Sequence, residues 1–340
     1  MGVQMSERAE RAVVITTIFP PTEVVRKFAA MSGWRLVVAG DRKTPADWAH
    51  PGVTFLSGAD QERSGYRIAR ELPWNHYCRK MIGYVRAIRM GAQVIVDTDD
   101  DNIPKPDWSF PEFEGEFLTT GNRLGFINVY RLFTGQTIWP RGFPLELLTS
   151  PQAAPTRDQL TPAVSRVGIW QGLADGDPDV DAIYRLTNNT ACYFNDGPPV
   201  VLGEGTVCPF NSQNTAYHRE LFPLLYMPAH VTFRFTDILR GLVAQPILWA
   251  AGWRLGFTKA TVVQERNPHN YLKDFESEIP CYLHAAKVID VVGSVVSSRL
   301  PVLENLVRAY RELVRVGIVP DRELPLLDAW LEDVGQGADE

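Results

Sequence analysis

Residues 93–102 read Gln-Val-Ile-Val-Asp-Thr-Asp-Asp-Asp-Asn, and no other stretch of the chain is as informative. The apolar run at 93–97 is typical of a short buried strand, and it leads directly into the triplet Asp99, Asp100 and Asp101. Prolines soon afterwards break any further regular structure. The triplet is therefore predicted at the C-terminal edge of a strand, which is where open α/β sheets bind their ligands.

The segments before this strand predict a strand–helix repeat. Residues 12–18 (AVVITTI) and 34–39 (WRLVVA) predict two strands, and Thr22 can cap a helix at 23–31 between them. Two strands that flank a helix form a βαβ unit, which implies a parallel sheet. Apolar residues at helical spacing predict another helix at 75–90, just before the acidic strand. The pattern indicates the opening of a nucleotide-binding α/β fold.

The rest of the chain predicts irregular structure followed by helices. Residues 108–205 are rich in Pro, Gly, Asn and Asp, which is typical of short strands and loops that build a binding surface. An amphipathic helix is predicted at 234–253, kinked or interrupted at Pro246. Further helices are predicted at 276–297 and 300–317 because their apolar residues recur at helical spacing.

Length and composition are those of an ordinary globular protein. The 340 residues are 45% hydrophobic and 22% charged, enough for one large core. We expect a disordered tail at 1–11, a catalytic domain at 12–290 and a helical extension at 291–340. The first residues do not resemble a signal peptide, and no apolar run approaches the roughly 20 residues of an integral membrane segment.

Charge and cysteine usage exclude some classes of protein. A net charge of -6 without a long basic stretch argues against nucleic-acid binding. The four cysteines have no CxxC spacing, so they predict neither a zinc site nor a disulfide scaffold. We therefore expect the thiols to be reduced and mostly buried, and the protein to be cytoplasmic. The sequence does not determine the oligomeric state, and a homo-oligomer is compatible with it.

The acidic cluster is the strongest candidate for a metal site. With Asp97, the triplet places four carboxylates within five positions, where they repel one another unless cations or donors meet them. Mg²⁺ and Mn²⁺ favour oxygen ligands and are often shared between carboxylates and substrate phosphates. The alternative is a solvated acidic turn that caps the next element. The position at a strand end favours the metal site.

Basic residues around the cluster are candidates for binding phosphate. Arg79 and Lys80 lie in the preceding helix and could face phosphate oxygens, although an exposed basic pair is an equal alternative. Arg141 lies between two prolines and next to a glycine, so a stiff turn presents its side chain. A protonated guanidinium is a poor nucleophile, so its chemistry alone indicates a phosphate or carboxylate clamp.

Weaker candidates are spread along the chain. Asp41 closes the second predicted strand and is a candidate nucleotide contact, as is Asn214, which ends a segment of small and amide residues suited to sugar hydroxyls. Asx-rich turns explain such a segment equally well. Asp237 could be a catalytic or sugar-binding acid, or it could satisfy a helix dipole. His269 is a candidate metal ligand.

The order of these motifs resembles a known family. The chain contains, in sequence, VVITTI, VVAGDRKTP, CRKMIGY, VIVDTDDD, RGFPLEL, GTVCPFNSQNTAYHREL, RFTD and NPHNY. From about residue 12 to residue 278 this series is similar to the reversibly glycosylated polypeptides, the plant UDP-arabinopyranose mutases. It is equally similar to the related domain of the STELLO glycosyltransferases. The specific part is the aspartate triplet with CRxxxGY before it and RGFP after it.

The resemblance implies a GT-A-like fold, which is a Rossmann-like, mixed and mostly parallel sheet flanked by helices with a helical C-terminal part. It also implies a divalent metal, Mn²⁺ or Mg²⁺, and a nucleoside-diphosphate sugar, with UDP favoured. In this family Asp99, Asp100 and Asp101 match the metal and diphosphate triplet. Arg79 matches the basic residue of the preceding helix, and Arg141 matches the arginine that becomes reversibly glycosylated.

Two positions depart from the family pattern. Asp237 matches the second of two adjacent acidic residues in the mutases, but Thr236 replaces the first. The mutases also carry a histidine shortly before the Asn-Pro step near their C-terminal end, and this chain does not. Glu265 and His269 are the candidates for a third metal ligand.

Three functions follow as hypotheses. The first is a nucleotide-sugar pyranose/furanose mutase, in which the sugar is held transiently at or near Arg141. The second is a glycosyltransferase that passes the sugar to an external glycan, with Arg141 as an electrostatic clamp. The third is a non-catalytic protein that binds nucleotide sugars. The mutase is slightly preferred, because the RGFP turn is retained.

Overall fold

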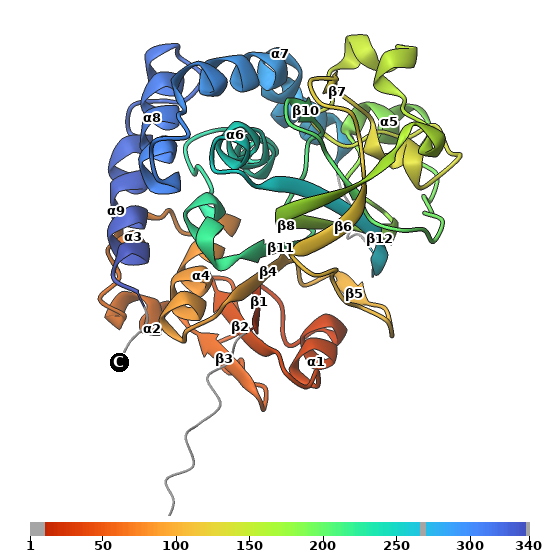
Figure 1. The fold of residues 1–340 in the computed structure, drawn as a ribbon. Helices are drawn as coiled ribbons and strands as arrows, with labels where there is room; N and C mark the ends of the chain where they lie inside the picture. Colours follow the sequence, from red (N-terminus) through yellow and green to blue (C-terminus); the bar gives the residue numbers. More distant parts are fainter. Residues whose placement is uncertain (1–10, 266–269, 338–340) are drawn as a thin grey trace, which may run out of the picture.

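A computed structural model describes residues 11–265 and 270–337 (Figure 1). Within them, a mixed sheet of ten strands forms the centre of an α/β fold consistent with a GT-A-like glycosyltransferase fold. The strand order is β3-β2-β1-β4-β11-β8-β6-β9-β12-β5, and β10 pairs with β7 in a small second sheet. The strands are β1 (Arg11–Thr17), β2 (Arg35–Gly40), β3 (Val53–Leu56), β4 (Val94–Thr98), β5 (Asn102–Pro104), β6 (Glu114–Thr119), β7 (Gly125–Phe126), β8 (Thr161–Gly176), β9 (Val200–Val201), β10 (Thr206–Val207), β11 (Asn214–His218) and β12 (Arg254–Gln264).

Helices cover both faces of the central sheet. The predicted βαβ opening is confirmed, since β1 pairs in parallel with β2 and with β4, and the side chain of Thr22 caps the first helix. Beyond β4 the sheet becomes mixed, because β11 is antiparallel to β4 and to β8. The helices are α1 (Glu23–Ala29), α2 (Gly58–Arg63), α3 (Arg67–Glu71), α4 (Lys80–Arg89), α5 (Ala182–Thr187), α6 (Thr236–Ala250), α7 (Tyr271–Val295), α8 (Val302–Arg315) and α9 (Glu323–Gly335).

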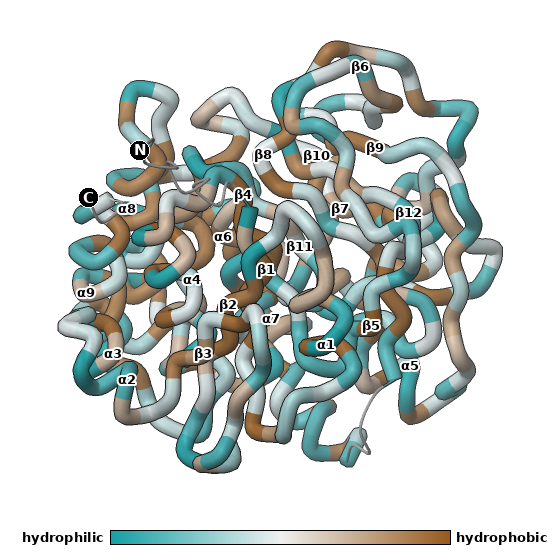
Figure 2. Tube along the Cα trace, turned by 90° about the horizontal axis from the view of Figure 1, so that it is seen from below, coloured by the Kyte–Doolittle hydropathy of each residue, from teal (hydrophilic) through white to brown (hydrophobic). Residues whose placement is uncertain are grey.

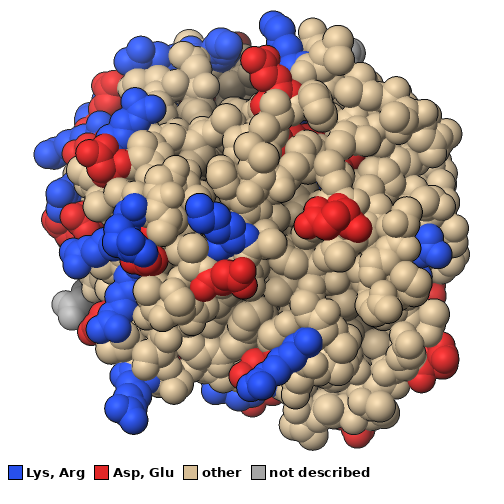
Figure 3. All heavy atoms as spheres, turned by 90° about the horizontal axis from the view of Figure 1, so that it is seen from above, with Lys and Arg blue, Asp and Glu red and all other residues tan. Residues whose placement is uncertain are grey.

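Alternation along β1 divides the hydrophobic core between the two faces. Ala12 and Val14 belong to one core cluster with α4, whereas Val13 and Ile15 belong to another with Phe28 of α1. In Figure 2 the hydrophobic stretches of β1 and β2 lie in the middle of the molecule. On the face drawn in Figure 3, basic and acidic residues are interspersed. The central strands are packed on both faces, so their carboxyl ends can position the side chains of a binding site.

The structure corrects several expectations about the elements. Residues 108–205 contain the 16-residue strand β8, which pairs with β6, β11 and β12 instead of forming only short strands. The helix α6 is not amphipathic, because residues 236–248 are all buried, and it continues through Pro246. It is covered by α7 and α8, which lie with α9 in an arc on the outside (Figure 1).

The C-terminal helices share the core of the sheet. The helix α7 runs through residue 290, where the sequence suggested a domain boundary, and α9 was not predicted. Trp330 of α9 is fully buried in the same cluster as α4 and α6. All four cysteines are buried free thiols, as expected. In the described part of the chain, no helix combines the length and apolar character needed to cross a membrane.

Two helical glycines give a matched test of the packing around α6. A Cβ atom at Gly241 of α6 would lie 2.5 Å from the carbonyl oxygen of Phe210, whereas one at Gly293 of α7 would meet nothing within 4 Å. We expect Gly241→Ala to lower the free energy of unfolding by about 1–3 kcal/mol through overpacking. Gly293→Ala should raise it by up to about 1 kcal/mol, because alanine favours the helix. Urea unfolding measures the free energy of unfolding of both variants. Equal changes in the two variants would contradict the close contact between Gly241 and Phe210.

Candidate active site

The acidic triplet lines a cavity at the carboxyl end of β4. This strand ends at Thr98, and Asp99, Asp100 and Asp101 follow before β5 begins, as predicted. The cavity has a volume of about 240 Å³. Its other lining residues are Thr16, Tyr77, Arg141, Asp179, Asn211, Ser212, Gln213, Phe233, Arg234, Asp237 and Gln264. The cavity therefore joins the triplet to residues that are distant in the sequence.

Lys80 fixes the base of the triplet. Its fully buried ammonium group donates to Asp97 Oδ1 at 2.9 Å, to Asp99 Oδ1 at 2.6 Å and to the carbonyl oxygen of Thr98 at 2.8 Å. Burial alone would lower the pKa of Lys80, but Asp97 and Asp99 raise it above its usual value. The lysine thus stays charged and orients one oxygen of Asp99.

The triplet concentrates negative charge in a buried place. Burial raises the pKa of Asp99 to about 6 despite Lys80, with Asp101 and Asp97 adding to the rise. Burial also raises the pKa of Asp100, although Thr17 Oγ1 donates to its carboxylate and opposes the shift. A divalent cation would stabilise these carboxylates in their ionised form.

The oxygen donors of the triplet fit Mg²⁺ or Mn²⁺ when substrate phosphates complete the shell. In the described ranges, no group of three or more His, Cys, Asp or Glu side chains is arranged to hold a metal ion without such help. A second hollow of about 450 Å³ shares Asp100 and Asp101 and reaches Glu265, one of the candidate third ligands. The other candidate, His269, lies outside the described residues.

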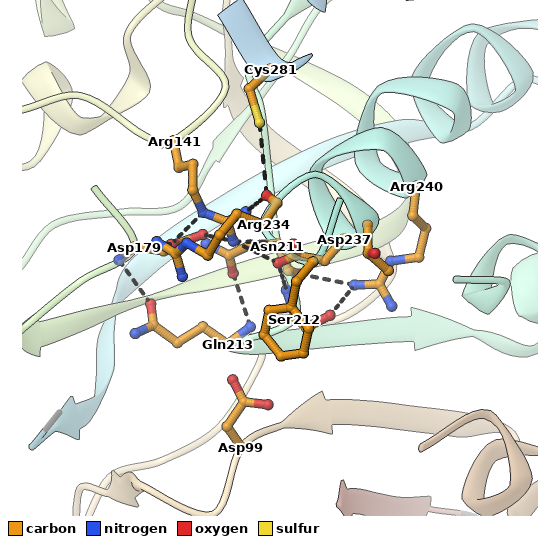
Figure 4. A network of polar contacts seen from close by, with 12 residues as sticks. Asp99, Arg141, Asp179, Asn211, Ser212, Gln213, Arg234, Asp237, Arg240 and Cys281 are labelled. Carbon is orange, nitrogen blue, oxygen red and sulfur yellow. Dashed lines mark hydrogen bonds and ion pairs between the residues drawn. The ribbon is translucent and has the colours of Figure 1, made fainter. Parts of the chain in front are cut away.

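Arg141 is held between two carboxylates on the far side of the cavity (Figure 4). Its Nε and Nη2 donate to Asp179 at 2.8 and 2.7 Å, and Nη2 donates to Asp237 Oδ2 at 2.9 Å. Its Nη1 donates to the carbonyl oxygen of Arg234. The predicted stiff turn is visible at Gly142, which has a φ of 85° and where a Cβ would lie 2.4 Å from Ile238.

The surroundings of Arg141 disfavour a nucleophilic role. Burial alone would lower its pKa, but Asp179 and Asp237 raise it well above its usual value, so the guanidinium stays protonated. The side chain is only 4% exposed and donates to both carboxylates. Its geometry is that of a carboxylate clamp, which is one of the two roles expected from its chemistry.

Asp237 faces the cavity from the first turn of α6. Besides Arg141, it accepts hydrogen bonds from the Ser212 backbone N–H at 3.3 Å and from the Tyr77 hydroxyl at 3.5 Å. Its place in the first helical turn suits the helix dipole, which is one of the two alternatives weighed for this residue, and the catalytic or sugar-binding role stays a prediction. The carboxylate is oriented by three donors and lies opposite the triplet on the cavity wall.

Arg79 is not part of this cavity. Its guanidinium group lies over the ring of Trp74, 3.4 Å from the ring centroid, and donates to Gln61 Oε1 at 2.7 Å and to the carbonyl oxygen of Leu72 at 3.0 Å. Burial lowers its pKa to about 10. These contacts hold the segment before α4 in place, and they count against the expected contact with phosphate.

Asp41 and Asn214 also serve the fold. Asp41 accepts from the backbone N–H groups of Arg42, Asn75 and His76 at 2.6 to 3.0 Å, and so ties the end of β2 to the segment before α4. Asn214 is fully buried and bonds to Trp108 and Thr261. Neither residue lines the cavity around the triplet, so their positions do not favour a contact with the nucleotide. The expected nucleotide contacts of Asp41 and Asn214 stay predictions.

Residues that the sequence analysis did not single out complete the cavity. Asp179 follows β8 in the segment Gly-Asp-Pro-Asp, which is an acidic strand end with a proline, the same signal that identified the triplet. Gln264 donates to Asp101 Oδ2 at 3.1 Å and accepts from Gln213. Gln213 belongs to the segment of small and amide residues that ends at Asn214, whereas no local signal distinguishes Gln264, and the two side chains meet only in the folded chain.

Comparisons with known proteins point to one group. The family model of the STELLO glycosyltransferases matches residues 234–337, which include Asp237. "Probable glycosyltransferase STELLO1" of Arabidopsis thaliana is 27% identical over 346 residues, covering 96% of this chain and 44% of the relative. "Probable glycosyltransferase STELLO2" of the same plant is 27% identical over 348 residues, covering 97% of this chain and 45% of the relative.

The chain thus spans less than half the length of these curated relatives. The expected resemblance to the STELLO glycosyltransferases is supported, and these matches lend no support to the mutase family. Over nearly its whole length, this chain is similar to part of two proteins named probable glycosyltransferases, which supports the transferase hypothesis better than the mutase hypothesis.

Proposed function

We propose that this chain is a metal-dependent glycosyltransferase that moves a sugar from a nucleoside-diphosphate donor to an acceptor outside the protein. One observation carries the proposal: a single cavity brings Asp99–Asp101 together with Asp237, which the Arg141 clamp orients. A transferase needs these two functions side by side, a site for the diphosphate and a carboxylate near the sugar. The similarity to proteins named probable glycosyltransferases supports the same activity.

The triplet would hold the diphosphate end of the donor. Mn²⁺ or Mg²⁺, when bound, supplies the positive charge that offsets the leaving diphosphate. Asp99 and Asp100 contribute oxygen ligands, while Lys80 keeps Asp99 in place from beneath. Within the described residues, the two arginines that line the cavity are already engaged with carboxylates, so a divalent cation would supply the positive charge for the diphosphate.

Asp237 would act as the general base of the transfer. Its carboxylate takes the proton of the acceptor hydroxyl, whose oxygen then forms a bond to the anomeric carbon as the bond to the diphosphate breaks. Arg141 contacts both oxygens of this carboxylate and fixes its orientation. Asp179 completes the clamp by holding the other edge of the guanidinium.

The experiment that tests the proposal separates transfer from isomerisation. The protein is incubated with UDP-, GDP- and dTDP-sugars and Mn²⁺, with and without a panel of glycan acceptors, and the products and the protein are analysed by mass spectrometry. A transferase gives acceptor-dependent product and no adduct on Arg141. A furanose nucleotide sugar formed without acceptor, or a sugar on Arg141, would overturn the proposal in favour of the mutase.

Metal dependence gives a prediction for Asp100. We expect UDP to bind in the presence of Mn²⁺, and we expect Asp100→Asn to weaken binding about 10- to 100-fold, as is common for changes around metal ligands. Isothermal titration calorimetry with and without EDTA measures this affinity. The control is Asp107→Asn, whose side chain is 54% exposed and pairs with Lys259 at 2.6 Å. UDP binding that survives EDTA unchanged would contradict a metal-held diphosphate.

A further inference from the structure

An exposed aromatic ring stands at the rim of the cavity. Phe233 lies in the loop before α6, lines the cavity, and is 53% exposed. Tyr77 supports it from the opposite segment in an edge-on contact, with ring centroids 4.6 Å apart. His76 stacks on Tyr77 at 5.4 Å. The rim therefore offers one exposed ring backed by two others.

The ring is held next to the carboxylate assigned as the base. The hydroxyl of Tyr77 donates to the carbonyl oxygen of Phe233 at 3.2 Å and to Asp237 Oδ1 at 3.5 Å. The next residue, Arg234, is anchored through its side chain to Glu278 at 2.9 Å. The Phe233 ring is thus fixed relative to Asp237, and a ligand stacked on it has its polar groups near that carboxylate.

The charges of the cavity restrict the kind of ligand. Among the residues that the structure describes, the lining carries the carboxylates of the triplet, Asp179 and Asp237, and the guanidinium groups of Arg141 and Arg234. Both arginines already pair with carboxylates. In this described lining the carboxylates outnumber the guanidinium groups, so a uronic acid or a phosphorylated acceptor would be repelled more than a neutral sugar.

We propose that Phe233, backed by Tyr77, is the acceptor platform of the enzyme, and that it stacks on a neutral pyranose ring of a glycan beside Asp237. The C–H face of such a ring covers the exposed aromatic surface, while its hydroxyl groups reach the carboxylate and the amide side chains of the cavity. The inference rests on the proposed transferase function and adds the class of acceptor and its subsite. A nucleobase stacked on Phe233 is the competing occupant.

Direct binding tests the platform without depending on turnover. Cellotetraose and mannotetraose serve as neutral probes and tetragalacturonate as the anionic probe, with binding to the protein alone measured by saturation-transfer NMR and calorimetry. We expect a neutral tetrasaccharide to bind the wild type more tightly than tetragalacturonate does. Phe233→Ala should weaken neutral binding about tenfold, equivalent to about 1.4 kcal/mol, and Phe233→Trp should stay within about twofold because it keeps an aromatic face.

Two comparisons make the outcome decisive. Leu283→Ala removes an apolar side chain that is 66% exposed on α7 and does not line the cavity, and it should leave oligosaccharide binding unchanged. UDP affinity with Mn²⁺ is measured in parallel for each variant. The proposal is overturned if neither neutral oligosaccharide binds the wild type, if Phe233→Ala binds them normally, or if Phe233→Ala weakens UDP binding instead. Failure of the transferase function itself shows separately, as no donor cleavage by the wild type.

Discussion

Replacing Asp97 by alanine is expected to lower the free energy of unfolding by about 3–5 kcal/mol, because it leaves two buried cations without their common partner. Asp97 Oδ1 accepts from Lys80 at 2.9 Å, and Oδ2 accepts from Arg240 Nη1 at 2.8 Å. All three side chains are essentially inaccessible to solvent. Against the opposing effect of burial, Asp97 raises the pKa of Lys80, and Tyr217 and Asp97 together raise the pKa of Arg240, so both cations keep their charge.

Urea unfolding at neutral pH measures this loss, with Asp107→Ala as the control. Asp107 pairs with Lys259 on the surface, where an ion pair contributes at most about 1 kcal/mol. A triple variant, Asp97→Leu with Lys80→Met and Arg240→Met, should recover much of the stability, because it removes both buried cations together with Asp97 and leaves only Asp99, whose side chain is 39% exposed, without its lysine. A loss below about 1 kcal/mol in Asp97→Ala would show that water reaches the cations.

Local sequence was enough to place the triplet. The apolar run at 93–97 and the acidic residues after it are contiguous, so strand and strand end could both be inferred from a few positions. The long strand β8 was missed because its segment has the Pro and Gly content of loops, while its order comes from pairing with β6, β11 and β12. These pairings join segments that are distant in the sequence, so no local pattern predicts them.

The same limit explains Arg79 and Lys80. They are neighbours in the sequence, but Arg79 ends a 3₁₀ turn and Lys80 begins α4, so their side chains leave the helix in different directions. Only Lys80 reaches the triplet, at Asp99. The starting point of the helix decides which of them does so, and sequence alone places helix ends with an error of one or two residues.

The clamp around Arg141 could be predicted only in part. Its chemistry indicated a carboxylate or phosphate partner, but the two partners found lie 38 and 96 positions away in the sequence. Tertiary folding alone brings Asp179, at the end of β8, and Asp237, at the start of α6, to the same guanidinium. The sequence identifies the charged groups, but only the fold shows that the guanidinium and the two carboxylates contact one another.

Asp237→Asn is expected to lower the kcat for sugar transfer by about 10²–10⁴-fold, the usual contribution of a general base. The amide keeps the shape of the side chain but cannot take the proton of the acceptor hydroxyl. Affinity for UDP and Mn²⁺ should change little, because the triplet, not Asp237, binds the diphosphate. Steady-state kinetics with saturating donor and acceptor, together with calorimetry of UDP binding, measure the two effects separately.

Asp179→Asn is the matched control for Asp237, because both carboxylates pair with Arg141 at nearly equal distances of 2.7 and 2.9 Å. Each substitution removes one negative charge from the same guanidinium, but only Asp237 is placed to take the acceptor proton. We therefore expect kcat to fall much less in Asp179→Asn than in Asp237→Asn. Equal losses in the two variants would mean that the clamp acts through its charge alone, and that another group accepts the proton.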